Sequence, residues 1–288
     1  VVYAISPAEA AQTDPQQRIL LAQAFNALKH CGEAMAAIKG CERSVAVGIG
    51  AAEYVTIMLN AAMEITPYMS LQGSLSVSCG RISYTFGFSG PSVSIDTACS
   101  ASLVGMHLAN LFIRTGESNS SMAAGVNFTL LAYGYVFFAV TGMLAPDGRC
   151  KTLDQSGDGY VRAEACGAVQ MQPDSDEMHE VLVYVPGSSV NQDGRSSSLT
   201  APNGPSQQAA IRKATEVAGM SIEHYEYLEM HGTGTALGDP IEIGAASAVI
   251  LKPKSKRGPV TLWGAKSAFG HSEAGAGAIG LLHSLTAF

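Results

Sequence analysis

The chain has 288 residues, 47% of them hydrophobic and only 14% charged, which excludes a disordered protein because so apolar a chain offsets its ordering entropy by burial. At about 100–200 residues per domain, this length corresponds to one large or two modest domains. The 17 Lys and Arg against 24 Asp and Glu give a net charge of −7, which argues against nucleic acid or an anionic membrane surface as a partner.

The first half of the chain predicts helices that alternate with short strands. Asp14 is a suitable N-cap and Pro15 a suitable first residue for a helix that Gly32 ends. The helices are expected at 15–32 and 98–114, and the strands at 45–49, 92–96 and 122–127.

No charged residue lies between Glu117 and Asp147. A membrane-spanning helix needs about 20 predominantly apolar residues, but polar residues and glycines interrupt this stretch. We therefore expect a buried strand followed by a buried helix, and no membrane span. The N-terminus shows no basic region followed by an apolar one, so no secretory signal is predicted.

The second half continues the alternation, which is typical of α/β layers. Residues 252–258, with four Lys and Arg, are expected to form a solvated loop. The strands are expected at 166–171, 181–185, 225–230 and 260–263, and the helices at 205–219, 240–251 and 272–288.

The cysteines are spread along the chain without a C-x-x-C pair, which fits neither a zinc site nor a disulfide scaffold. We expect no metal site, free thiols in a reducing compartment and a cytoplasmic location, with a plastid location left open. The six are Cys31, Cys41, Cys79, Cys99, Cys150 and Cys166.

Cys99 lies between an apolar strand that ends at Asp96 and a long helix. A thiol at the start of a helix feels the positive end of the helix dipole, which lowers its pKa and favours the thiolate. Backbone N–H groups there can hold an oxyanion. Such an elbow suits acyl transfer, although a buried structural cysteine is an equal alternative at this point.

His231 and His271 follow predicted strands and are flanked by glycines. A single histidine is more often structural than catalytic, but two in such positions, together with Cys99, favour catalysis. Beside His231, Thr233 and Thr235 offer hydroxyls to a long polar ligand. The three candidate catalytic residues lie in separate βα units and can meet only through the fold.

Seven motifs run in a fixed order over essentially the whole chain. They are D-P-Q-Q-R (14–18), G-P-S-V-S-I-D-T-A-C-S-A-S-L (90–103), P-D-G-R-C-K-T-L-D (146–154), D-G-Y-V-R-A-E-A-C-G (158–167), N-Q-D-G-R-S-S-S-L-T-A-P-N-G-P (191–205), H-G-T-G-T-A-L-G-D-P-I-E (231–242) and K-S-A-F-G-H-S-E-A-G-A-G (266–277). With these motifs the chain resembles the β-ketoacyl synthase (ketosynthase) domains of modular type I polyketide synthases.

The resemblance implies an α/β thiolase fold of two duplicated βαβαβ halves in a layered α-β-α-β-α arrangement. The N-terminal half would cover 1–165 and carry Cys99, and the C-terminal half would cover 166–288 and carry both histidine motifs. Relative to the family, we expect the chain to lack the first strand region before Val1 and a glycine-rich active-site loop after Phe288.

The resemblance also implies a β-ketoacyl-[acyl-carrier-protein] synthase, an acyltransferase of polyketide biosynthesis. Cys99 would accept an acyl chain, which then condenses with malonyl-carrier in a decarboxylative Claisen reaction. His231 and His271 would assist decarboxylation and stabilise the enolate. Lys266 and Glu273 would hold the second histidine and its surroundings.

By the same resemblance, Thr233 and Thr235 would bind the phosphopantetheine arm of acyl carrier protein. No cofactor of the chain's own and no metal are needed, because acyl and malonyl thioesters arrive on that arm. The family further implies a homodimer within a larger multidomain synthase, with no nucleic acid or membrane as partner.

Two departures from the family pattern and two alternatives remain open. Ala268 replaces a usual Asn, and Ala163 and Ala165 replace usual glycines. The alternatives are a fatty-acid-synthase condensing enzyme and a non-elongating ketosynthase that acts as an acyl-carrier-binding module. Degradative thiolases are disfavoured, because they use a second cysteine where this chain has a histidine motif.

Overall fold

The computed structural model describes residues 3, 5–175, 181–250 and 258–286, and it divides into two compact units. Unit 1 comprises 1–134, 163–180 and 272–279, and unit 2 comprises 135–162, 181–271 and 280–288. Both units draw on segments that are distant in sequence, so neither is a continuous stretch of chain.

Unit 1 contains a four-stranded sheet in the order β2-β1-β3-β4. The strands are β1 (Arg43–Gly48), β2 (Ser92–Ile95), β3 (Ser120–Asn127) and β4 (Ala165–Met171). β1 pairs in parallel with β2 and β3, and β4 pairs antiparallel to β3. β1 is buried along its whole length, as expected for a strand covered on both faces. The strands expected at 45–49, 92–96, 122–127 and 166–171 are confirmed within one or two residues.

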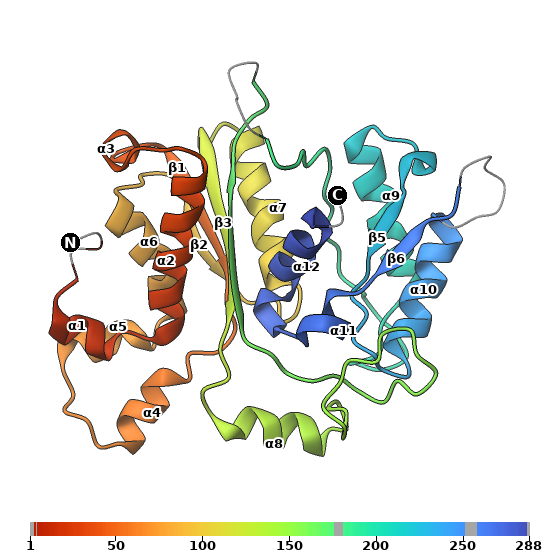
Figure 1. Cartoon of the computed structure of the whole chain (residues 1–288), viewed down its shortest axis with the longest axis horizontal. Helices are drawn as coiled ribbons and strands as arrows, with labels where there is room; N and C mark the ends of the chain where they lie inside the picture. Colours follow the sequence, from red (N-terminus) through yellow and green to blue (C-terminus); the bar gives the residue numbers. More distant parts are fainter. Residues whose placement is uncertain (1–2, 4, 176–180, 251–257, 287–288) are drawn as a thin grey trace. The chain divides into compact units, whose positions relative to one another are not determined.

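Helices cover both faces of this sheet. Figure 1 shows α2 (Pro15–His30) and α6 (Leu75–Phe86) on one face and α7 (Ala101–Arg114) on the other. α2 begins as expected, because the Asp14 carboxylate accepts a hydrogen bond from the Gln16 N–H at 2.7 Å. Its Leu20 and Leu28 are fully buried in the core of unit 1.

Shorter elements complete unit 1. The sequence analysis did not anticipate α6, nor four shorter helices. These are α1 (Pro7–Gln12), α3 (Met35–Ile38), α4 (Tyr54–Asn60) and α5 (Pro67–Gln72). The helix expected at 272–288 begins instead as a 3-10 turn, η2 (Glu273–Gly275), which α12 (Ala276–Leu285) follows.

Unit 2 contains a parallel pair of strands, β5 (Tyr227–Glu229) and β6 (Thr261–Trp263). Two longer helices, α9 (Gly204–Ala218) and α10 (Gly238–Val249), pack against each other. Two short ones, η1 (Ile222–His224) and α11 (Ala265–Phe269), adjoin the strands. These strands and both longer helices confirm the sequence predictions, except that Leu251 lies outside the described residues.

The strand expected at 181–185 is wrong. These residues pair with none of the described strands, and their side chains are exposed. A continuous run of apolar residues thus predicted a strand where none of the described strands supplies a ladder. The loop expected at 252–258 lies outside the described residues except for Gly258.

The buried helix expected within 117–147 is also wrong. The strand β3 is buried as predicted, but the following helix α8 (Ala132–Val140) has no buried residue. Phe137 is 68% and Val140 84% exposed. The prediction failed because a segment without charged residues can be buried but need not be, since burial also requires another surface that covers the helix.

Among the described residues, no helix is long and apolar enough to cross a membrane.

Two glycines let the start of α7 lie directly on the sheet of unit 1. A Cβ at Gly48 would lie 2.4 Å from the Ser102 backbone nitrogen, and one at Gly125 would lie 2.5 Å from the Ser102 Cβ. Ser102 is fully buried there, and its hydroxyl accepts a hydrogen bond from the Ala278 N–H at 3.0 Å. The position of α7 therefore depends on the absence of side chains at the ends of β1 and β3.

We expect Gly48→Ala to lower the free energy of unfolding by about 1–3 kcal/mol, because the new methyl group must displace the backbone of α7. Urea denaturation followed by circular dichroism measures the change. Gly80→Ala, within α6, is the matched control: nothing lies within 4 Å of its added Cβ, so a change between zero and about 1 kcal/mol of stabilisation is expected. Equal effects of the two substitutions would contradict the proposed contact.

Candidate active site

Cys99 lies in a tight turn between β2 and α7. The helix expected from Ala98 begins at Ala101, because residues 97–100 form the turn. Ala98 has a positive φ of 52°, a conformation that costs free energy in a residue with a Cβ. The Asp96 carboxylate accepts a hydrogen bond from the Ala98 N–H at 3.0 Å and so holds this conformation. Cys99 is thus presented two residues before the helix.

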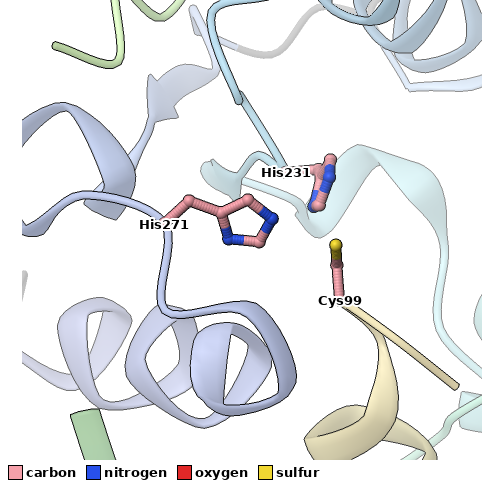
Figure 2. A group of neighbouring side chains, drawn as sticks. All are labelled: Cys99, His231 and His271. Atoms are coloured by element: carbon pink, nitrogen blue, oxygen red, sulfur yellow. The ribbon is translucent and has the colours of Figure 1, made fainter. Parts of the chain in front are cut away.

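His231 and His271 meet within unit 2. His231 follows β5, and His271 follows α11 at the turn of Gly270. Their ring centroids lie 5.6 Å apart with the planes at 88°. Figure 2 shows each imidazole projecting from a loop, and it also draws Cys99 just ahead of its helix. The structure therefore brings together two side chains that are 40 residues apart in sequence.

Neighbouring groups hold the backbone and ring of each histidine. The two carboxylate oxygens of Glu242 accept hydrogen bonds from the N–H groups of His231 and Gly232. The His271 N–H donates to the Val161 carbonyl at 2.8 Å. The Tyr160 ring meets the His271 ring edge to face, with centroids 4.9 Å apart.

Both histidines are kept neutral near pH 7. The pKa of His231 is lowered to about 4, first by desolvation of the ring among its neighbours and second by the nearby Lys266 ammonium, although part of the residue is exposed. The pKa of His271, which is 1% exposed, is lowered to about 2 by burial, then by Lys266, His231 and Arg162. Lys266 itself is 7% exposed, in α11. A neutral imidazole retains one N–H donor, so the pair can donate two hydrogen bonds to one developing anion.

Thr233 and Thr235 lie in the loop that follows His231. Their hydroxyl oxygens are 3.2 Å apart, and the Thr235 hydroxyl accepts a hydrogen bond from the Gly238 N–H at 3.1 Å. Gly232 and Gly234 have positive φ values of 50° and 79°, which glycine adopts at little cost. The alternating glycines thus bring both hydroxyls close to the start of α10.

The candidate residues divide between the two units. The two histidines, Lys266 and the two threonines belong to unit 2, whereas Cys99 and Glu273 belong to unit 1. Glu273 begins η2 with a positive φ of 42°. Ala268 is exposed in α11.

The sequence analysis did not assign roles to three residues that contact this site: Tyr160, Asp239 and Glu242. All three lie within quoted motifs. The one available signal was the pair of acidic residues three apart in D-P-I-E, since that spacing places both on one face of a helix.

Family models match both parts of the chain. The model for the β-ketoacyl synthase N-terminal domain matches residues 2–177, and that for the C-terminal domain matches residues 182–288. The chain therefore belongs to the β-ketoacyl synthase family, and it has the thiolase-like α/β fold of that family. The expected division at residue 165 stays a prediction.

The curated relatives that the chain resembles are polyketide synthases. The chain is 42% identical over 286 residues to polyketide synthase GfsA of Streptomyces halstedii, covering 98% of this chain and 4% of that protein. It is 41% identical over 283 residues to erythronolide synthase EryA2 of Saccharopolyspora erythraea, covering 97% and 8%. The chain thus spans a small part of the curated relatives that it matches.

Solved ketosynthase structures agree with this relationship. The ketosynthase from module 6 of the bacillaene synthase of Bacillus subtilis 168 superposes with a TM-score of 0.90 at 34% identity, covering 99% of this chain and 49% of that one. The Streptomyces albus oxazolomycin ketosynthase domain OzmH KS7 gives 0.89 at 34% identity, covering 99% and 51%. The resemblance predicted from the seven motifs is confirmed.

The lowered pKa values predict how stability depends on pH. Below about pH 6.5 an unfolded histidine binds a proton, but folded His231 resists protonation until about pH 4. The free energy of unfolding is therefore expected to fall as the pH decreases from about 6.5 to about 4. His231→Gln should make this slope shallower in urea titrations at each pH. His30→Gln, at an exposed position in α2, is the matched control, and equal slopes for all three proteins would refute the assignment.

Proposed function

We propose that the chain is the condensing part of a polyketide synthase and acts as a β-ketoacyl-[acyl-carrier-protein] synthase, an acyltransferase. The observation that carries the proposal is the pair of neutral imidazoles beside Lys266, in a family member that keeps a cysteine elbow. The polyketide synthase relatives favour this reading over a fatty-acid-synthase enzyme. The proposed reaction uses the Cys99 sulfur as the nucleophile and the two imidazoles as hydrogen-bond donors.

Acylation of Cys99 is the first step. The thiolate attacks the carbonyl carbon of an acyl thioester on the carrier, and a C–S bond forms to Cys99 as the carrier C–S bond breaks. The carrier thiolate takes up the proton that Cys99 lost. Backbone N–H groups at the start of α7 would stabilise the tetrahedral oxyanion. The strained Ala98 supports this role, because strain at a turn is typical of presented nucleophiles.

Decarboxylation and condensation follow at the histidine pair. The malonyl C–C bond to the carboxylate breaks, carbon dioxide leaves, and the electron pair forms the thioester enolate. His231 and His271 donate hydrogen bonds to the enolate oxygen, which is where negative charge develops. The enolate carbon attacks the Cys99 thioester, and the Cys99 thiolate leaves to give a chain longer by two carbons.

The other candidate residues have supporting roles in this proposal. Lys266 keeps both rings neutral, so that they act as donors rather than as acids. Glu273 positions the backbone before α12. Thr233 and Thr235 bind the phosphopantetheine arm of acyl carrier protein, which delivers the acyl and malonyl thioesters, so the chain needs no cofactor of its own. We further propose a homodimer within a larger multidomain synthase, located in the cytoplasm.

Intact-protein mass spectrometry with acyl-carrier and malonyl-carrier tests the assignment in the full-length encoded protein. Cys99→Ala should abolish acylation. His271→Ala should still acylate but lower carbon dioxide release and condensation by at least about 100-fold, because an enolate donor is lost.

Arg114→Gln, on the surface of α7, is the control. Acylation of the Cys99→Ala protein at the wild-type rate would overturn the nucleophile assignment. A wild-type protein that acylates without releasing carbon dioxide would favour the non-elongating alternative.

A further inference from the structure

Asp239 lies in the first turn of α10, eight residues after His231. Asp239 is buried, with 6% of its surface exposed, and both of its carboxylate oxygens accept hydrogen bonds from backbone N–H groups. Oδ1 accepts a hydrogen bond from the Gly234 N–H at 3.0 Å, and Oδ2 accepts one from the Leu153 N–H at 2.8 Å. One carboxylate therefore joins two loops that are about 80 residues apart in the chain.

These loops, 150–154 and 231–235, lie directly against each other. The Thr152 hydroxyl donates to the Gly232 carbonyl at 2.6 Å. A Cβ at Gly234 would lie 2.6 Å from the Lys151 backbone nitrogen. Because Gly234 has no side chain, the loops lie close together at this point, and the hydrogen bonds of Asp239 and Thr152 connect them.

Gly234 is the residue between the two threonines. Asp239 fixes the Gly234 N–H, and one residue earlier in α10 the Gly238 N–H fixes the Thr235 hydroxyl. The loop is thus fastened to the start of one helix at two adjacent points. A buried charged acceptor makes stronger hydrogen bonds than a neutral one, and a carboxylate at a helix N-terminus is favoured by the helix dipole.

We propose that Asp239 is a positioning residue that sets the placement of the Thr233 and Thr235 hydroxyls and thereby the affinity for the carrier-bound arm. This inference rests on the proposed function of the two threonines. Asp239 does not touch the reacting atoms, so its effect falls on substrate capture and not on the chemical step.

Steady-state condensation with malonyl-carrier, in the full-length encoded protein, separates these effects. Asp239→Asn keeps the shape and one acceptor but turns an NH₂ group toward the other N–H, so a KM increase of about 10-fold with kcat within threefold is expected. Asp239→Ala loses both acceptors and should raise KM further. Glu216→Gln is the control, because this exposed carboxylate of α9 pairs with Lys213 on the same helix, outside both loops.

A double-mutant cycle tests whether Asp239 affects KM by positioning the Thr233 and Thr235 hydroxyls. In the Thr233→Val, Thr235→Val background the arm contacts are absent, so Asp239→Asn should raise KM by less than about twofold. The rate of Cys99 alkylation by iodoacetamide, which needs no arm, should be unchanged by Asp239→Asn. Additive KM effects in the cycle, or a loss of kcat at unchanged KM, would overturn the proposal.

Binding of phosphopantetheine-loaded carrier, measured by calorimetry, separates failure of this inference from failure of the proposed function. A wild-type protein that binds the carrier but does not condense would refute the function alone. If wild type condenses and Asp239→Asn binds the loaded carrier as tightly as wild type, the inference about Asp239 fails and the proposed function stands.

Discussion

The site in unit 2 depends on one constraint: the backbone N–H groups of a loop without a strand partner must find other acceptors. The loop after β5 leaves its strand pair at His231 and has no ladder to satisfy it. Two carboxylates from α10 supply the acceptors, Glu242 for His231 and Gly232, and Asp239 for Gly234. A single helix thereby determines where the first histidine and the two threonines lie.

In unit 1, close packing holds the turn that carries Cys99 and the helix α7 that follows it. The turn at 97–100 is held by Asp96, and the helix that follows lies against the sheet where Gly48 and Gly125 have no side chains. The same contact buries Ser102, which in turn accepts the Ala278 N–H at the start of α12. The elbow is therefore rigid because its helix cannot shift without moving the sheet or α12.

The electrostatics of the histidine pair follow from desolvation of the rings together with one buried cation. Lys266 lies near both rings and disfavours a second positive charge there, so each imidazole stays neutral. A neutral pair is suited to donating hydrogen bonds to an enolate, whereas an imidazolium would also protonate the carbanion that must attack.

The sequence by itself determined the order of most helices and strands, the cap at Asp14 and the family, because local periodicity and contiguous motifs carry that information. It also singled out Cys99, His231 and His271, since their glycine-flanked and helix-start positions are visible locally. Only the tertiary structure decided that 181–185 has no strand partner, that α8 is exposed and that His231 and His271 face each other. It alone revealed the roles of Asp239 and Glu242. The physical reason is the same in each case: pairing, burial and hydrogen-bond satisfaction depend on groups far away in the chain, which no local pattern records.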